Sequence, residues 1–344
     1  MTWNRLISFS PECQTFQGLS SVAVGPNGSP TFSTTKAFTN TRTLRIHATL
    51  RIGYIFPSTM TQIRTGFWIN HAGPTVAQTA TLFGILLVGG SYLNLRWNQS
   101  TSEIDVTLAT VPVDSISVPA SLAATDTWMH IGLFYSADST SGRFILYVNG
   151  VEVYAYTGDT GSGATGAYMP SAYATNQNWG SYLYLDDWFV DGGSGNSEGP
   201  PPAARFLFAL PNAAGDDSQW SVFPSGSNYQ AVDEATFDTD TTYVYAASSG
   251  LQDLYNFANV TLPLGYSIAT VRGIVYGKKS NAAVDTELKL VISDGATDVE
   301  SSAIDLTTGY TLLTATFDTD PSGTPWTEST VNSTQFGIKS SGTF

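Results

Sequence analysis

The chain has 344 residues, enough for two domains of ordinary size that each bury a core of their own. Only 12% of the residues are charged, about half the ~25% of typical soluble proteins, so Ser, Thr, Asn, Gln and Gly must supply much of the surface. The net charge of −14 argues against nucleic-acid partners, because affinity for phosphates rests on Lys and Arg.

Targeting signals and disulfides are not evident in the sequence. Cys13 is the single cysteine, so no intramolecular disulfide can form. Residues 1–14 contain no continuous apolar stretch of the signal-peptide type, and no apolar run approaches the ~20 residues of a membrane helix. We therefore expect a chain that folds in a reducing cytoplasm and has no membrane partner.

The first element in chain order is the segment of residues 1–17, which precedes the first clear strand. Its large apolar residues would be a liability in water if nothing covered them. We predict that it docks on a partner or a neighbouring subunit and serves for attachment. The alternative is that it completes the first domain as an edge strand, because termini often pair in that way. The attachment residues are Trp3, Leu6, Ile7 and Phe9.

Residues 18–195 have almost no helical pattern. Apolar residues alternate or form short runs bounded by Gly, Pro, Asn and Ser, as in short antiparallel strands. Many such strands with glycine-rich turns indicate a β-sandwich or jelly roll. The predicted strands lie at residues 43–52, 66–70, 81–90, 92–98, 104–111, 128–136 and 181–192.

The strongest local signal is the stretch RFILYVNGVEVYAY, Arg143–Tyr156. Two β-rich runs flank Asn149-Gly150 in this stretch. Both central residues of a type I′ turn need a positive φ, which Asn and Gly tolerate. The sequence therefore predicts a β-hairpin with a two-residue turn at this pair.

A long loop, residues 165–182, follows the hairpin and is rich in aromatic and amide side chains. The C–H faces of sugars pack on aromatic rings, and amides hydrogen-bond to hydroxyl groups. One interpretation is a carbohydrate-binding site, and the other is an interface anchored by aromatics in an assembly. The candidate sugar-binding residues are Tyr168, Tyr173, Asn176, Asn178 and Trp179.

Three pairs of aspartates are candidate Ca²⁺ ligands, because Ca²⁺ takes several oxygen ligands and closely spaced aspartates can supply two. The other interpretation is that these residues end strands and accept hydrogen bonds from nearby backbone. No cofactor other than Ca²⁺ is expected. The pairs are Asp186 and Asp187, Asp238 and Asp240, and Asp318 and Asp320.

A Gly/Ser/Pro linker is predicted at residues 196–204. Its Gly and Ser residues favour flexibility, whereas the three prolines at 200–202 favour an extended form. Residues 199–344 hold 16 acidic and 6 basic residues, against 12 and 8 in residues 1–198, which supports a boundary here. A second β-sandwich is predicted for residues 205–344, with strands at 205–210, 242–248, 253–260, 267–277, 286–293, 310–318 and 335–340 and a helical turn at 325–332.

The span Thr127–Gly158, with the motif LYVNG at Leu146–Gly150, resembles the signature hairpin of concanavalin A-like and laminin-G-like jelly rolls. The stretch YLYLDDWFVDG, Tyr182–Gly192, is similar to the closing strand of that family. The resemblance covers residues 18–195. It implies a lectin-like jelly roll, for which a carbohydrate-binding adhesion module is one function.

The glucanases that share this jelly roll have a Glu-x-Asp-x-Glu core, which residues 102–107 resemble. Glu103 and Asp105 match, but Thr107 stands where the second glutamate belongs, and retaining glycosidases need two carboxyl groups ~5–5.5 Å apart. We therefore expect no enzyme, and a glycan depolymerase is the least favoured hypothesis. No metal-ligand spacing or catalytic motif connects the three histidines, His47, His71 and His130.

The second domain resembles a domain of virion proteins of tailed bacteriophages. Together with the laminin-G-like domain, this resemblance implies a structural virion protein, displayed on capsid or tail and assembled in the host cytoplasm. Its expected partners are other virion proteins, further copies of the chain, and host surface polysaccharide. The residues that carry the match are Trp220, Asp233, Asp240, Tyr243, Val244, Trp326, Thr327, Phe336 and Gly337.

Overall fold

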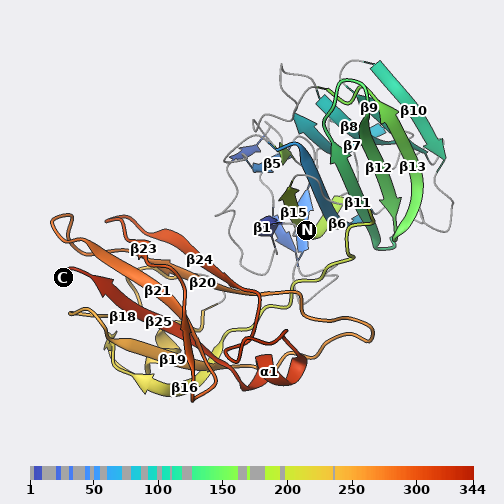
Figure 1. Cartoon of the computed structure of the whole chain (residues 1–344). Coiled ribbons are helices and arrows are strands. Elements are labelled where there is room, and N and C mark those ends of the chain that lie inside the picture. The colour runs from blue at the N-terminus through green and yellow to red at the C-terminus, as the bar shows by residue number, and fades with distance from the viewer. Residues whose placement is uncertain are drawn as a thin grey trace. The chain divides into compact units, whose positions relative to one another are not determined.

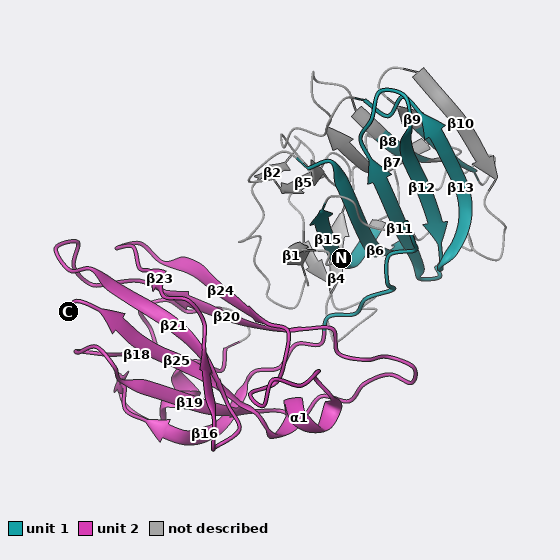
Figure 2. Cartoon of the chain, viewed as in Figure 1, with its two compact units in different colours: residues 1–206 teal, residues 207–344 magenta. Residues whose placement is uncertain are grey.

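The contacts of the chain divide it into two compact units, unit 1 (Met1–Phe206) and unit 2 (Leu207–Phe344), coloured teal and magenta in Figure 2. Both units consist of antiparallel β-sheets, which confirms the predicted all-β class with two β-sandwich domains. The division lies just after the predicted linker, residues 196–204. The computed structural model describes residues 4–9, 21–24, 31–33, 43–46, 50–54, 60–71, 79–86, 92–98, 103–108, 111–117, 126–161, 169–170, 183–193, 198–234 and 237–344.

The largest sheet of unit 1 has eight strands (Figure 1). Seven of them follow one another in the order β13 (Val151–Gly158), β12 (Gly142–Val148), β11 (Met129–Ser136), β6 (Gln62–His71), β15 (Leu183–Gly193), β4 (Thr43–Ile46) and β3 (Thr31–Ser33). The eighth strand, β1 (Asn4–Phe9), pairs with β15. β6 pairs along one edge of β15. On the other edge, β4 pairs with the first residues of β15 and β1 pairs with its last residues.

The N-terminal segment, residues 1–17, therefore contributes a strand to unit 1, which is the alternative to the docking prediction. Phe9 lies opposite Trp188 and Asn4 opposite Gly192, with one register shift between them. The physical reason is that this half of β15 needs hydrogen-bond partners on the edge away from β6. Trp3 lies outside the described residues, and the attachment role of Leu6, Ile7 and Phe9 stays a prediction.

Two smaller sheets complete unit 1. One contains β10 (Val111–Ser117), β9 (Glu103–Leu108), β8 (Tyr92–Asn98) and β7 (Thr79–Leu86), and the other contains β14 (Met169–Pro170), β5 (Leu50–Tyr54) and β2 (Ser21–Val24). The single strand predicted at residues 43–52 is wrong, because β4 and β5 belong to different sheets. Alternation of apolar residues marks an extended backbone but does not identify the neighbour with which it pairs.

The predicted hairpin is confirmed. Val148 pairs with Val151 across the turn, and φ is 50° at Asn149 and 79° at Gly150. The Asn149 side-chain oxygen accepts a hydrogen bond from the backbone N–H of His130 at 2.8 Å, and the backbone N–H of Asn149 donates to the His130 carbonyl. Asn149 therefore shapes the turn and also fastens it to the neighbouring strand β11.

Residues 198–205, which include most of the predicted linker, pack on one face of the eight-stranded sheet; we call them the covering segment. The ring of Pro201 lies against Gly132 of β11, where an added Cβ would be 3.0 Å from Pro201 Cδ. Trp68 of β6 donates its indole N–H to the Ala204 carbonyl at 3.1 Å. Pro201 is buried, so this stretch is a fixed part of unit 1.

Unit 2 has one six-stranded sheet and two ribbons of two strands each. The sheet follows the order β16 (Pro211–Ser218), β19 (Gln252–Phe257), β25 (Gln335–Gly342), β21 (Thr286–Ser293) and β22 (Asp298–Glu300), with β23 (Ile304–Asp305) also paired to β21. The ribbons are β17 (Ser221–Phe223) with β18 (Tyr243–Tyr245), and β20 (Val271–Gly277) with β24 (Thr311–Phe317). A 3₁₀ turn, η3, covers Asn228–Ala231.

The core of unit 2 lies between the six-stranded sheet and the ribbons. Leu288 and Ile338 of the sheet cluster with Leu313 of β24. Val244 of β18 and Val275 of β20 pack against the same cluster. The two ribbons therefore form the second layer of this sandwich.

Two other predictions for unit 2 have different outcomes. The strand predicted at residues 205–210 is wrong, and a strand with mostly small and polar side chains, β16, begins at Pro211 instead. β16 is an edge strand with mostly exposed side chains, so it lacks the apolar alternation that marks a strand. The helical turn predicted at 325–332 is confirmed as α1 (Glu328–Ser333), which begins after a capping box at Thr327. Among the described residues, no helix has the length and apolar character to span a membrane.

Candidate functional site

The five residues predicted to bind sugar in unit 1 lie outside the described residues. They are Tyr168, Tyr173, Asn176, Asn178 and Trp179. Within that loop the structure describes only β14, which pairs with β5 through Met169 and Pro170. Carbohydrate binding by this loop therefore stays a prediction.

The glucanase-like carboxylates lie on strand β9. Glu103 and Asp105 alternate with the buried side chains of Ile104 and Val106, so the two carboxylates share the face of the strand that points away from the core. In the register, Asp105 lies opposite Arg96 of β8 on one side and a serine of β10 on the other. Neither residue directly opposite Asp105 is therefore the second carboxylate that retaining chemistry requires.

His130 is buried in the eight-stranded sheet rather than placed in a catalytic pair. Its ring lies 5.1 Å from the Trp68 ring, and within the described residues neither ring nitrogen has a hydrogen-bond partner. Burial lowers the pKa of His130 to about 4, so the imidazole is neutral at physiological pH. His71 ends strand β6, and His47 lies outside the described residues.

The predicted Ca²⁺ ligands occupy three separate places. Asp186 and Asp187 are buried at an irregularity of β15, where the Asp187 N–H donates to Asp186 Oδ1 at 2.9 Å. Asp238 and Asp240 lie in the loop before β18, and Asp318 and Asp320 follow β24. Among the described residues, no group of three or more His, Cys, Asp or Glu side chains could hold a metal ion. Ca²⁺ binding stays a prediction.

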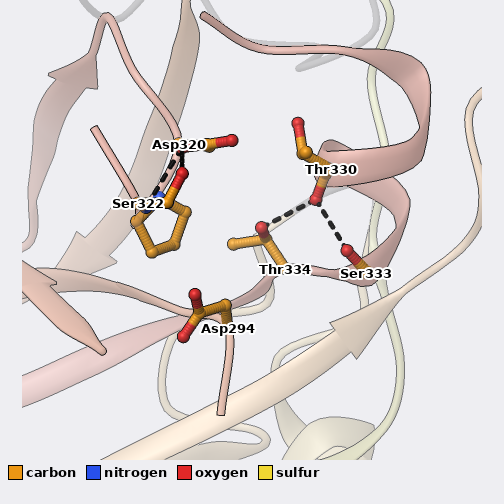
Figure 3. Close-up of a pocket in the computed structure, with 7 residues that line it drawn as sticks. Asp294, Asp320, Ser322, Thr330, Ser333 and Thr334 are labelled. Carbon is orange, nitrogen blue, oxygen red and sulfur yellow. Dashed lines mark hydrogen bonds between the residues drawn. The ribbon is translucent and has the colours of Figure 1, made fainter. Parts of the chain in front are cut away.

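A polar hollow of about 160 Å³ lies beside α1, with Asp294 and Asp320 on its wall (Figure 3). The Asp320 carboxylate accepts four hydrogen bonds of 2.7–3.0 Å from Ser322 and Thr324, and these bonds lower its pKa. Thr330 also uses its carbonyl internally, as acceptor for Ser333 and Thr334. The polar groups of this hollow thus stabilise the local turns, and Asp320 follows the interpretation of an aspartate that accepts hydrogen bonds from nearby backbone.

The outer face of the β17–β18 ribbon carries three aromatic rings. Phe223 lies opposite Tyr243 in the register, and Tyr245 follows two positions later on the same face. Val244 between the two tyrosines packs into the core, so the tyrosine rings point outward. Phe223 is 44% exposed and Tyr245 46% exposed, and the Phe223 and Tyr243 rings are stacked with their centroids 4.9 Å apart.

A second stack of rings adjoins these three. Tyr276 of β20 stacks on Phe237 at 4.6 Å and on Tyr310 at 5.0 Å between ring centroids. The Tyr310 hydroxyl donates a hydrogen bond to Asp240, which precedes Tyr243 by only three residues, so the two stacks lie near each other. We call the six rings the aromatic surface: Phe223, Phe237, Tyr243, Tyr245, Tyr276 and Tyr310.

Charged groups lie at the margin of the aromatic surface. Asp240 Oδ1 accepts hydrogen bonds from Lys278 Nζ at 2.7 Å and from the Tyr310 hydroxyl at 2.9 Å. These two bonds lower the pKa of Asp240, so the carboxylate is ionised at neutral pH. The arrangement places flat apolar ring faces beside a fixed carboxylate and an ammonium group, which suits the binding of an amphipathic ligand.

Solved structures similar to this chain include a cellulose-induced protein, one domain of an arabinanase and a lectin-like protein. A cellulose-induced protein is 13% identical, with a TM-score of 0.39, over 54% of this chain and 96% of its own. Domain 4 of an extracellular arabinanase from Geobacillus stearothermophilus, in complex with arabinotriose, is 14% identical, with a TM-score of 0.40, over 56% and 94%. Arcelin-5, a lectin-like defense protein from Phaseolus vulgaris, is 10% identical, with a TM-score of 0.37, over 54% and 98%.

These similarities are too distant to carry an argument about function. No protein-family model matches the sequence, and no curated protein matches it. A function is therefore inferred from the side chains of this chain.

Sequence reasoning missed the aromatic surface. In the sequence analysis, Tyr243 appears only among the residues that resemble phage proteins. Phe223 and Tyr245 are not predicted there as site residues. The available signal was the alternation in Tyr243-Val244-Tyr245, which places two rings on one face of a strand. The stacking partner, Phe223, is twenty positions away in the sequence, and only the paired ribbon brings it opposite Tyr243.

Proposed function

We propose that this protein is a non-catalytic carbohydrate-binding protein and that the aromatic surface of unit 2 binds a glycan. One observation carries the proposal. Phe223, Tyr243 and Tyr245 share the outer face of one ribbon, and two of the three rings are nearly half exposed. A folded chain gains no stability from leaving such rings in water, so their exposure favours a ligand that covers them.

Sugars fit the combination of rings and charges better than other ligands do. The C–H face of a pyranose is apolar and flat, so it packs on a ring, while its hydroxyl groups need hydrogen-bond partners at the ring's edge. Asp240 and Lys278 supply an acceptor and a donor there. Nucleic-acid bases also stack on aromatic rings, but residues 199–344, with 16 acidic and 6 basic residues, would repel their phosphates.

The loop at residues 165–182 of unit 1 is a second place where the chain could hold a sugar. Its aromatic and amide composition and the lectin-like resemblance of unit 1 support this part of the proposal. Two weak sites in one chain would strengthen attachment to a polysaccharide, since a polymer presents many copies of the same unit. The natural partner would then be a polysaccharide on a cell surface.

Affinity electrophoresis of the full chain through gels that contain β-glucan, β-mannan or galactan tests the proposal, together with a glycan array for other polymers. We expect retardation by at least one glycan. Changing both Phe223→Ala and Tyr245→Ala should weaken binding about 30-fold or more, because each exposed ring contributes on the order of 1–2 kcal/mol. Leu264→Ala removes a fully exposed apolar side chain from the loop between β19 and β20, so it serves as the matched control.

Two outcomes would contradict this proposal. Binding that survives the double ring substitution would place the site elsewhere, with the loop at 165–182 as the next segment to change. No binding by the unaltered chain to any glycan of the gels or the array would reject carbohydrate binding altogether.

A second candidate function is a structural role in the virion of a tailed phage. The resemblance of unit 2 to phage virion domains and the low share of charged residues, 12%, favour it. In that setting the aromatic surface would be a contact with another virion protein or with a second copy of the chain, because aromatic residues are enriched at interfaces. Mass spectrometry of purified virions tests this candidate, since a structural protein must be present in the particle.

A further inference from the structure

Asp240 and Lys278 form a fixed pair of acceptor and donor at the margin of the aromatic surface. Lys278 Nζ lies 2.7 Å from Asp240 Oδ1 and 4.3 Å from the centroid of the Tyr310 ring. The Tyr310 hydroxyl donates to the same carboxylate oxygen at 2.9 Å. Three segments hold the pair: the loop before β18, the residue after β20 and the residue before β24.

Part of the hydrogen-bonding capacity of this pair is open to solvent. The Asp240 side chain is 67% exposed, and both of its hydrogen bonds within the described residues end on Oδ1. Oδ2 of Asp240 is therefore available as an acceptor. The Lys278 ammonium group has three N–H donors and uses one of them on Asp240. A free acceptor beside free donors complements a sugar hydroxyl, which accepts and donates at once.

The charges around this pair disfavour an anionic ligand. Asp240 already neutralises Lys278, so that ammonium group is not a free partner for a carboxylate. Asp238 and Glu234 add negative charge in the same loop, where the Thr242 hydroxyl lies 2.8 Å from Asp238 Oδ2 and 2.7 Å from Glu234 Oε1. A uronate or sulfate on the rings would therefore meet the like charges of Asp238 and Glu234, while Lys278 is already paired with Asp240.

We propose that the aromatic surface binds an uncharged glycan, and that Asp240 and Lys278 are its specificity-determining residues. The C–H faces of the glycan lie on Phe223 and Tyr245, and hydroxyl groups of the same chain bond to Asp240 Oδ2 and Lys278 Nζ. This inference rests on the proposed function and adds the class of ligand and the two residues that select it.

The test compares one polymer in two charge states. The probes are the neutral polysaccharide that the chain binds best and the same polymer after oxidation of its primary hydroxyl groups to carboxylates. We expect the oxidised polymer to bind at least about 10-fold more weakly, because it places like charges next to Asp238 and Asp240. Binding of the neutral polymer should change less than about 2-fold between roughly 50 and 500 mM NaCl, because no net ion pair forms.

Substitutions then test whether the pair of Asp240 and Lys278 causes the preference for the neutral polymer. Asp240→Asn keeps the shape of the side chain but leaves Lys278 without its counter-charge. It should reduce binding of the neutral polymer about 10-fold. The ratio between the affinities for the neutral and the oxidised polymer should become smaller as well. Glu300→Gln is the matched control, because Glu300 also bonds to lysines in unit 2 but lies on the six-stranded sheet of the opposite layer.

The outcomes separate this inference from the proposed function. If the chain binds glycans through its rings but Asp240→Asn binds the neutral polymer as well as the unaltered chain does, Asp240 plays no part and the inference is wrong. Equal binding of the neutral and oxidised polymers would equally overturn it. If the double ring substitution leaves binding unchanged, the aromatic surface is not the site, and the proposed function fails together with this inference.

Discussion

Each unit has a sheet face with aromatic residues, which is covered in unit 1 and exposed in unit 2. In unit 1, Trp68 and Tyr147 lie on the face of the eight-stranded sheet that the covering segment packs against, and Tyr147 is buried. In unit 2, Phe223 and Tyr245 lie on the outer face of the β17–β18 ribbon and stay nearly half exposed. The same chain therefore buries one aromatic face and leaves the other open.

This difference bears on function because the chain has the means to cover such a face. In unit 1 the covering segment, with the buried Pro201, packs over part of the aromatic face. An exposed aromatic face that served no purpose would weaken solubility, which supports the proposal that a ligand or partner covers the one in unit 2. The comparison predicts that the rings of unit 1 act on stability and those of unit 2 on binding.

The sharpest test of the comparison removes one ring from each face. Tyr147→Ala should lower the free energy of unfolding of unit 1 by about 3–4 kcal/mol, because it deletes a buried ring beneath the covering segment. Tyr245→Ala should change the stability of unit 2 by less than about 0.5 kcal/mol, since its ring is exposed. Hydrogen exchange followed by mass spectrometry reports both units in one experiment, because peptides from β11–β12 and from β19–β21 are separate.

Similar losses of stability from the two substitutions would contradict the comparison. In that case the rings of unit 2 would contribute to its fold, and their exposure would need no ligand to explain it.

The two units should also differ in how their stability depends on pH. His130 is buried in unit 1, and burial lowers its pKa from 6.5 to about 4. Between these two values the unfolded chain binds a proton that the folded chain does not, so unit 1 loses stability as pH falls from about 6.5 to about 4. The loss should be about 3 kcal/mol and should be absent above pH 6.5.

His130→Leu isolates this effect. Leucine does not titrate, and it replaces an imidazole whose nitrogens have no partner within the described residues, so its cost at pH 7 should be small. Urea unfolding at pH 7 and at pH 4.5 gives the comparison. Unit 2 contains no histidine. Its shifted carboxylates have lowered pKa values, so their contribution is lost only as pH falls through those lowered values; they are Asp240, Asp294, Glu300 and Asp320. If the leucine variant loses stability in acid as the unaltered chain does, other groups are responsible.

Sequence patterns predicted the fold class because they depend on local chemistry. The turn at Asn149-Gly150 needs positive φ at both positions, and few other pairs adopt it easily, so its hairpin could be placed to the residue. Pairing between distant segments could not be predicted in the same way. β1 pairs with β15, which lies more than 170 residues away in the sequence. The sequence of neither strand identifies the other as its partner.

The candidate site was harder to predict for a physical reason. Its rings come from β17, β18, β20 and the loops beside them, and each contributes only one or two aromatic residues. A candidate site in one contiguous loop, such as residues 165–182, is therefore easier to identify from the sequence than a surface assembled by tertiary structure. Asp240 was identified as a candidate metal ligand from its spacing to Asp238, yet its contacts in the structure are with Lys278 and Tyr310.

The smallest expected effects concern what holds the covering segment in place. Two contacts contribute: the buried ring of Pro201 against Gly132, and two hydrogen bonds of 3.0 and 2.9 Å from Arg143 to the Glu198 carboxylate. Pro201→Ala should cost about 1–2 kcal/mol, because it removes buried methylene groups and gives the unfolded chain more freedom. Glu198→Gln should cost at most about 0.5 kcal/mol, because both partners of this ion pair are partly exposed to solvent. Urea unfolding measures both costs, and limited proteolysis near residue 200 reports release of the segment. A larger loss from Glu198→Gln than from Pro201→Ala would mean that charge, rather than apolar packing, covers this face, and the contrast with the open face of unit 2 would no longer be one of hydrophobic burial.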